Sequence, residues 1–233
     1  MSTRAGSELI EKWRATYNAP VSQFDLIIFD CDGVLVDSER LAVRAEALIL
    51  AELGWPLSEP EIIARFVGRS AADMCKEVEA HIERAVNWDE EFEARYREVF
   101  DKELVAVAGI IDTLNVIDAP TCVASSGTHA GIQYRLEKTG LFTRFEGRIF
   151  SSDDVARGKP APDLFLHAAH SIGVDPRKCA VVEDSVTGVV AGVEAEMTVF
   201  GFSGSVTSSE KLASAGATTF GAMSELPNLL IGN

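Results

Sequence analysis

Two pairs of acidic residues are the first candidates for chemistry, because each pair ends a short apolar run typical of a buried strand. Asp30 and Asp32 follow the first such run, and Glu183 and Asp184 end a later one. Side chains two apart in an extended segment point the same way, so Asp30 and Asp32 face one site. If the two strands are neighbours, four carboxylates converge, and their repulsion calls for a hard divalent cation such as Mg²⁺. The alternative is a set of solvated carboxylates that cap strand-to-helix loops.

Two further segments are suited to binding phosphate. The turn Ser125-Ser126-Gly127-Thr128 follows another apolar run and opens a helical segment, so its hydroxyl and backbone N–H groups can cradle an anion. Lys159 lies in the segment 158–163, whose two prolines stiffen the loop that would hold the ammonium toward an anion. The ordinary alternatives are a helix cap for the turn and an exposed side chain for the lysine. The sequence contains no G-x-x-x-x-G-K-[ST], G-x-G-x-x-G or H-E-x-x-H motif, which removes the main support for those nucleotide and zinc hypotheses.

The spacing of apolar residues predicts the elements that position these side chains. Short, non-alternating runs rich in Val and Ile predict strands buried on both faces of a parallel sheet. They are residues 24–29, 121–125, 148–151, 179–183 and 197–202. Helical segments at 128–139 and 162–172 lie between them, and each is followed by a glycine typical of a helix C-terminus. We therefore expect an α/β fold with a doubly wound, mostly parallel, Rossmann-like sheet.

One interval interrupts this alternation of strands and helices. Residues 39–107 show only helical periodicity, so we expect a helical cap domain inserted after the first strand. The α/β core domain would then comprise residues 21–38 and 108–233. Residues 1–20 are interpreted as an N-terminal extension, which carries charges and lacks the apolar stretch of a secretion signal.

Composition limits the kinds of partner. The 233 residues include 21 Lys and Arg against 36 Asp and Glu, for a net charge of −15. A surface this acidic repels nucleic-acid backbone and anionic lipid, and no apolar run reaches membrane-spanning length, so we expect neither partner. Four widely spaced cysteines without a C-x-x-C pair are typical of free thiols in a reducing compartment. We expect a cytoplasmic protein that is a monomer or a small homo-oligomer and takes a small-molecule substrate.

Together, the motifs make the chain resemble the haloacid dehalogenase-like hydrolases. They occur in order as DCDGVLVDSE at 30–39, Ser125, Lys159 in GKPAPD, and the pair Glu183-Asp184. The resemblance covers residues 22–220. The helical insertion resembles the cap of the β-phosphoglucomutase-like subfamily, and the chain looks most like bacterial sugar-phosphate phosphatases, the 6-phosphogluconate phosphatase type among them.

This resemblance implies a role for each acidic residue. Asp30 would attack phosphorus and form an aspartyl-phosphate. Asp32 would protonate the leaving oxygen and then accept a proton from the hydrolytic water. Mg²⁺ would be held by Asp30, the backbone carbonyl of Asp32 and Asp184, with Glu183 close by. We therefore expect a magnesium-dependent phosphomonoesterase.

The remaining family positions bear on which reaction is catalysed. Ser125 and Lys159 would bind the phosphoryl oxygens, with Ser126 beside them. Dehalogenases and phosphonatases of the superfamily lack the second aspartate of the first motif, whereas this chain has Asp32. Mutases that resemble this subfamily carry a histidine where this chain has Ala42. A phosphatase is therefore expected first, with a phosphosugar mutase or a catalytically silent phosphometabolite-binding module as alternatives.

Substrate specificity has three candidate residues. His129 opens the helix after the serine turn and could touch the substrate, although a surface histidine is the more common case. Arg65 and Arg69 flank a loop of the insertion and would suit a carboxylate or a second phosphate on the substrate, with an exposed arginine as the alternative. His167 and His170, three apart on a helix, are expected to be solvated rather than to bind a metal.

Overall fold

A six-stranded parallel sheet forms the centre of the computed structural model, which describes residues 22–67 and 71–231. The strand order is β3-β2-β1-β4-β5-β6, with each neighbouring pair parallel. The strands are β1 (Leu26–Phe29), β2 (Thr121–Ser125), β3 (Ile149–Ser151), β4 (Cys179–Glu183), β5 (Thr198–Phe202) and β6 (Thr218–Phe220). The first five match the runs predicted from the sequence. The edge strand β6 was not predicted, because two of its three residues are threonines and only Phe220 is buried, so that no apolar run forms.

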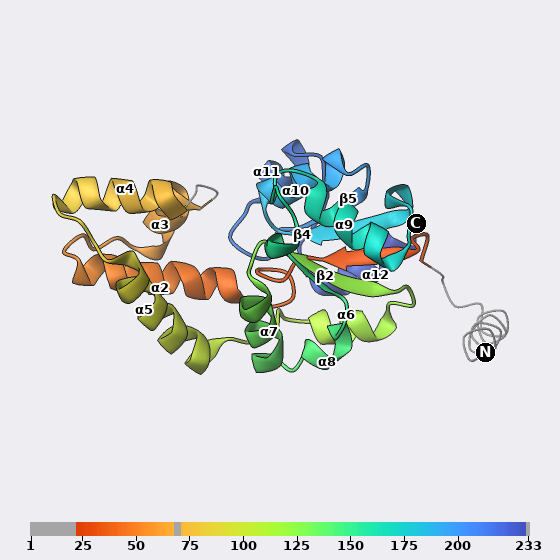
Figure 1. The fold of residues 1–233 in the computed structure, drawn as a ribbon, viewed down its shortest axis with the longest axis horizontal. Coiled ribbons are helices and arrows are strands. Elements are labelled where there is room, and N and C mark those ends of the chain that lie inside the picture. The colour runs from red at the N-terminus through yellow and green to blue at the C-terminus, as the bar shows by residue number, and fades with distance from the viewer. Residues whose placement is uncertain (1–21, 68–70, 232–233) are drawn as a thin grey trace.

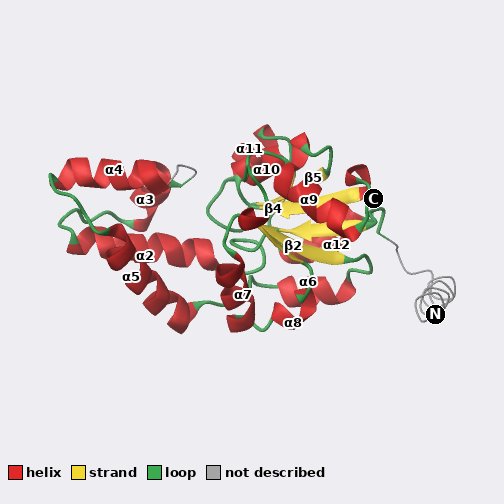
Figure 2. Cartoon of the chain, viewed as in Figure 1, coloured by secondary structure: helices red, strands yellow, loops and turns green. Residues whose placement is uncertain are grey.

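Helices cover both faces of the sheet, as the red helices around the yellow strands in Figure 2 show. They are α6 (Ile110–Val116), α7 (His129–Lys138), α8 (Phe142–Phe145), α9 (Asp163–Ile172), α10 (Val186–Glu194), α11 (Ser209–Ser214) and α12 (Leu226–Leu230). Short 3₁₀ turns lie at Ser152–Asp154, Pro176–Lys178 and Met223–Glu225. This arrangement confirms the expected doubly wound α/β fold.

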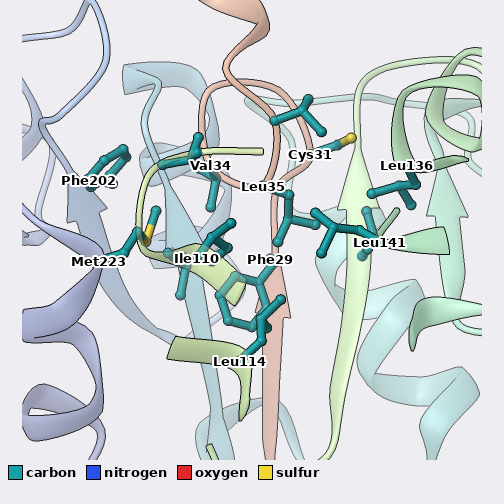
Figure 3. Close-up of a cluster of buried hydrophobic side chains, with 14 of the residues drawn as sticks. Phe29, Cys31, Val34, Leu35, Ile110, Leu114, Leu136, Leu141, Phe202 and Met223 are labelled. Atoms are coloured by element: carbon teal, nitrogen blue, oxygen red, sulfur yellow. The ribbon is translucent and has the colours of Figure 1, made fainter. Parts of the chain in front are cut away.

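Alternate side chains of strands β1 to β5 enter two separate hydrophobic clusters. In β1, Ile27 and Phe29 join α6, α7 and α12 on one face, whereas Leu26 and Ile28 join α9, α10 and α11 on the other. Figure 3 shows the first cluster, in which Phe29 lies among side chains that include Ile110 and Leu114. Because all four β1 side chains are fully buried, the strand reads as a continuous apolar run.

Of the five helices between β1 and β2, the first four project to one side of the sheet (Figure 1). They are α2 (Ser38–Glu52), α3 (Glu59–Phe66), α4 (Ala71–Ile82) and α5 (Trp88–Glu103). A third hydrophobic cluster, with Leu50, Ile62 and Val78 at its centre, joins α2, α3 and α4. At the start of α3, Ser58 and Glu61 form a capping box, in which the Glu61 carboxylate accepts a 2.8 Å hydrogen bond from the Ser58 backbone N–H. The division into core and cap domains stays a prediction, and residues 1–20 lie outside the described part of the chain.

The sheet topology brings the predicted chemical groups to one edge. β1 lies between β2 and β4, and Phe29 pairs with Val123 on one side and Val182 on the other. The residues that follow these strands therefore meet at the carboxyl edge of the sheet. The four cysteines are all free thiols. Within the described ranges, no helix is both long and apolar enough to cross a membrane.

Candidate active site

Lys159 is the centre of the charged site. Its ammonium Nζ donates to Asp30 Oδ1 at 2.7 Å, to Glu183 Oε1 at 2.6 Å and to the backbone carbonyl of Ala124 at 3.1 Å. Only 4% of the side chain is exposed. Burial lowers the pKa of Lys159, but the adjacent carboxylates of Asp30 and Glu183 raise it by more, so the group remains a cation. The side chain thus joins the ends of three adjacent strands.

Glu183 is held as firmly as the lysine that it contacts. Its Oε2 accepts hydrogen bonds of 2.9 Å from both the backbone N–H and the hydroxyl of Ser185, the N-cap residue of α10. Gly188, one turn into α10, makes room for this carboxylate, because a Cβ there would lie 1.7 Å from Glu183 Oε1. One oxygen is therefore committed to Lys159 and the other to the helix start.

Asp30, Glu183 and Asp184 form a buried group of three carboxylates, each with an oxygen within 4.8 Å of the others. Burial raises the pKa of Asp30 to about 7, although Lys159 opposes the rise. The pKa of Asp184 is raised well above its ordinary value, first by burial and then by the negative charges of Glu183, Glu39 and Asp30. Three carboxylates beside one lysine leave an excess of two negative charges, and carboxylate oxygen is the donor that Mg²⁺ prefers. The donor set and its charge therefore fit a hard divalent cation.

The backbone before α2 also approaches this group closely. Gly33 adopts φ +72°, and a Cβ at this position would lie 1.9 Å from Asp184 Oδ2. A side chain at residue 33 would thus be strained and would also displace the Asp184 carboxylate. The glycine of the first motif is required by this contact between the β1 and β4 ends.

Asp32 lies apart from the three-carboxylate group and has different partners. The Ser38 hydroxyl donates to Asp32 Oδ1 at 2.6 Å, and Arg135 Nε forms an ion pair with the same oxygen at 3.0 Å. About a quarter of each of the Asp32 and Arg135 side chains is exposed. The two aspartates of the first motif are therefore in distinct environments, with Asp30 bound to Lys159 and Asp32 bound to Arg135.

The serine turn lies beside Lys159. Ser125 is buried at the end of β2, and its hydroxyl accepts a 3.2 Å hydrogen bond from the Gly127 backbone N–H. Thr128 caps α7 by accepting from the Gly131 backbone N–H at 3.2 Å. Ser125 and Ser126 both line the cavity at this edge of the sheet. The turn therefore serves as a helix cap and also faces the charged site.

A cavity of about 610 Å³ lies over these groups. Its wall comes from the sheet edge and from the helices between β1 and β2, with Ala42, Ile63 and Tyr96 among the latter. The Tyr96 hydroxyl donates to Glu46 Oε1 at 2.9 Å. Glu39 also belongs to the cavity wall, and its pKa is raised to about 7, first by burial and then by the charge of Asp32.

Two of the three predicted specificity residues are described, and neither lines the cavity. His129 Nε2 lies 2.8 Å from Asp154 Oδ1, with half of its side chain exposed, and it is not part of the cavity wall. Arg65 pairs with Glu77 and lies over the Trp55 ring, also away from that wall. Arg69 lies outside the described residues. Of the histidine pair, His167 packs edge-on against Phe150.

Sequence reasoning did not identify Arg135, Ser38, Glu39, Tyr96 or Lys211 as residues of the site, yet all five line the cavity. For Arg135 the sequence does contain a signal. Glycines stand four and eight residues before it, on the side of α7 that leads back to the serine turn. Ser38 and Glu39 are the last two residues of the first motif, 30–39, which is a signal for them. Tyr96 and Lys211 follow no comparable pattern.

The chain also matches known proteins along most of its length. The model of the haloacid dehalogenase-like hydrolase family matches residues 24–196. A 6-phosphogluconate phosphatase of Escherichia coli is 34% identical over 90% of this chain and 96% of its own. A crystal structure of a haloacid dehalogenase-like protein from Agrobacterium tumefaciens has a TM-score of 0.81 and 36% identity, over 88% of this chain and 97% of that one.

A second solved structure, a hydrolase of the same family from Deinococcus radiodurans, contains bound phosphate and sodium. It has a TM-score of 0.78 and 30% identity, over 91% of this chain and 96% of that one. The family model spans the whole charged site, from Asp30 to Asp184, and the described fold agrees with both solved structures. The chain therefore belongs to the haloacid dehalogenase-like hydrolase family.

Proposed function

We propose that the protein is a Mg²⁺-dependent phosphomonoester hydrolase that acts on a small sugar phosphate through an aspartyl-phosphate intermediate. The observation that carries this proposal is the contact of Lys159 with Asp30, 2.7 Å apart, beside the three-carboxylate group and under the cavity. A carboxylate nucleophile, a cation for the phosphoryl oxygens and a site for a metal are the groups that phosphoryl transfer to a protein side chain requires.

In the proposed mechanism, a carboxylate oxygen of Asp30 attacks phosphorus, the P–O bond to the leaving group breaks, and an acyl phosphate, the aspartyl-phosphate, forms on Asp30. Asp32 donates a proton to the leaving oxygen. It then accepts a proton from the water that attacks the phosphoaspartate, which releases inorganic phosphate and restores Asp30. Lys159, Ser125 and Ser126 bind the phosphoryl oxygens throughout.

Mg²⁺ would be held by Asp30 and Asp184, with the backbone carbonyl of Asp32 as an expected further ligand. Glu183, whose two oxygens accept hydrogen bonds from Lys159 and Ser185, would lie close by. When bound, it would supply positive charge that offsets the phosphoryl oxygens and lets the anionic nucleophile approach the anionic ester. In the protein itself, Lys159 supports this arrangement by keeping Asp30 and Glu183 in fixed positions.

The substrate class rests on the relatives and on the cavity. The Escherichia coli relative is named for 6-phosphogluconate, and the Deinococcus relative binds phosphate. A cavity of about 610 Å³ is of the size that holds a small metabolite. The cavity wall also carries polar groups on Tyr96 and Glu39, which can form hydrogen bonds with sugar hydroxyls.

The mutase alternative is disfavoured by one position of the cavity wall. Ala42 lines the cavity where related mutases carry a histidine, and its methyl group cannot move a proton. The dehalogenase alternative is disfavoured by Asp32, because departure of a halide needs no proton donor. The silent-module alternative is disfavoured by the same residue, since binding alone needs no acid.

The test is phosphate release from a panel of sugar phosphates in the presence of Mg²⁺. We expect turnover that stops in EDTA and in Asp30→Asn. Asp32→Asn should keep substrate binding while turnover of alkyl phosphates falls about 10²–10⁴-fold, the usual range for general acid–base catalysis. Asp175→Asn, which alters an exposed pair with Arg177, is the control and should retain wild-type turnover.

Three results of this panel would contradict the proposal. The absence of phosphate release from every ester would overturn the phosphatase assignment. Conversion of β-glucose 1-phosphate to glucose 6-phosphate without net phosphate release would favour the mutase. Ligand binding with turnover at the background rate would favour the silent module.

A further inference from the structure

Arg135 is the one basic residue of α7 that lines the cavity, within the described part of the chain. Its guanidinium Nε lies 3.0 Å from Asp32 Oδ1, and three-quarters of the side chain is buried. The Nε atom has no aligned hydrogen-bond acceptor among the described residues, so the Asp32 carboxylate is the group that balances its charge. Neither the metal site nor the phosphoryl-binding residues account for an arginine here.

The path of the Arg135 side chain is kept open by glycines. In a helix, side chains lean toward the N-terminus, so Arg135 passes over Gly131, four residues earlier, on its way to the serine turn. A Cβ at Gly131 would lie 2.9 Å from Arg135 Nη1, and one at Gly127 would lie 3.6 Å away. On its other side the guanidinium lies over the Phe100 ring, with 5.8 Å between Cζ and the ring centroid. The side chain is thus confined between α7 and the end of α5.

Both close partners of Asp32 contact the same oxygen. Ser38 donates its hydroxyl hydrogen to Oδ1, and Arg135 Nε pairs with Oδ1. Two partners on one oxygen restrict rotation of the carboxyl group about its Cβ–Cγ bond. The second oxygen, Oδ2, is then the one left to meet the leaving group.

We propose that Arg135 is a positioning residue that holds the Asp32 carboxyl so that Oδ2 meets the leaving oxygen of the substrate. This inference rests on the proposed phosphatase function, in which Asp32 is the proton donor. Arg135 itself transfers no proton and binds no phosphoryl oxygen. Its role is to preserve an orientation, and a displacement of about 1 Å at a reacting group can cost on the order of 100-fold in rate.

The leaving group of the ester distinguishes this role from others. An alkyl phosphate such as a sugar phosphate needs a proton on its departing oxygen, whereas p-nitrophenyl phosphate releases a stable anion that barely needs one. We expect Arg135→Met to lower kcat for the best sugar phosphate by roughly 10–100-fold, with KM changed by less than about 3-fold. With p-nitrophenyl phosphate, kcat should fall by less than about 3-fold. Arg135→Lys, which keeps a cation near Oδ1, should retain more sugar-phosphate turnover than Arg135→Met.

A second variant separates positioning from folding. Gly131→Ala leaves Arg135 in place but pushes against its Nη1, so it should lower sugar-phosphate turnover by a few fold and spare p-nitrophenyl phosphate. Because alanine favours the helix over glycine, the Tm should stay the same or rise. Lys138→Met, which removes a different cation from the same helix, is the matched control and should keep wild-type turnover of both esters.

The decisive measurement combines Arg135→Met with Asp32→Asn. If Arg135 acts through Asp32, the double variant should hydrolyse sugar phosphates no more slowly than Asp32→Asn alone. Three results would each overturn the inference. One is a further loss of turnover in the double variant, and another is an equal loss of kcat on both ester classes. The third is a raised KM with unchanged kcat in Arg135→Met, which would show direct substrate binding. An inactive wild-type enzyme would overturn the proposed function as well. An active wild type with a fully active Arg135→Met would overturn the positioning role alone.

Discussion

Removal of divalent cations should make the stability of this protein depend steeply on pH. Asp30 and Asp184 are buried beside Glu183, and one lysine, Lys159, neutralises only part of their charge. We expect the free energy of unfolding in EDTA to fall as the pH rises from 5 to 8. With excess Mg²⁺ the fall should be much smaller, because a cation at these oxygens stabilises the ionised carboxylates in the folded state.

The sign and size of the effect follow from Asp30. Burial raises its pKa from 3.8 in the unfolded chain to about 7 in the folded one. Between these values the folded state binds a proton that the unfolded state does not, so raising the pH favours unfolding. The full contribution to stability is present below about pH 3.8, is lost progressively as the pH rises toward 7, and changes little above 7. At about 1.4 kcal/mol per pKa unit, the two units between pH 5 and 7 correspond to about 3 kcal/mol.

Urea unfolding at pH 5, 6, 7 and 8, each in EDTA and in Mg²⁺, measures this free energy directly. Asp30→Asn is the matched variant, because the amide keeps the shape of the side chain and cannot ionise. In EDTA, raising the pH from 5 to 7 should lower the unfolding free energy of this variant by about 3 kcal/mol less than it lowers that of the wild type. The comparison also corrects for the general repulsion in a chain of net charge −15, which both proteins share.

Two results would refute the reasoning. Equal pH dependence of the wild type and Asp30→Asn in EDTA would show that burial does not raise the pKa of this carboxyl. Unchanged pH dependence of the wild type on addition of Mg²⁺ would show that the three-carboxylate group is not the metal site.

Three further predictions concern the same site. Lys159→Met leaves Asp30 and Glu183 buried without their cation, so it should cost about 3–5 kcal/mol of unfolding free energy without Mg²⁺; an unchanged urea midpoint would contradict this. Gly188→Ala places a Cβ 1.7 Å from Glu183 Oε1, so it should lower the unfolding free energy by about 1–3 kcal/mol in the same assay. It should also weaken the Mg²⁺-dependent gain in Tm. A wild-type Tm would show that the carboxylate moves freely. Ca²⁺ accepts more oxygen ligands at longer distances than Mg²⁺, so replacing Mg²⁺ by Ca²⁺ should inhibit phosphate release while still raising the Tm. Undiminished turnover with Ca²⁺ would show that catalysis does not depend on how the metal places Asp30.

Local sequence patterns predict five of the six strands and bring most of the charged residues to one edge of the sheet. The strands β1 to β5 are predicted because each forms a short apolar run in the local sequence. In β1, β2 and β4 this run follows from burial of every residue. Asp30, Glu183 and Ser125 are predicted to meet because parallel strands end at one edge. Both inferences need only local patterns and a general rule of sheet geometry.

Which of these groups are in contact depends on the tertiary structure. It places β1 between β2 and β4, so that Lys159 reaches Asp30, 129 residues away in the chain, and Glu183, 24 residues away. It also places Arg135 rather than Lys159 on Asp32, and it leaves His129 and Arg65 outside the cavity wall. These pairings depend on strand order, loop path and the packing of α7 against α5. Local periodicity does not encode them, because the contacting residues belong to segments that meet only in the folded chain.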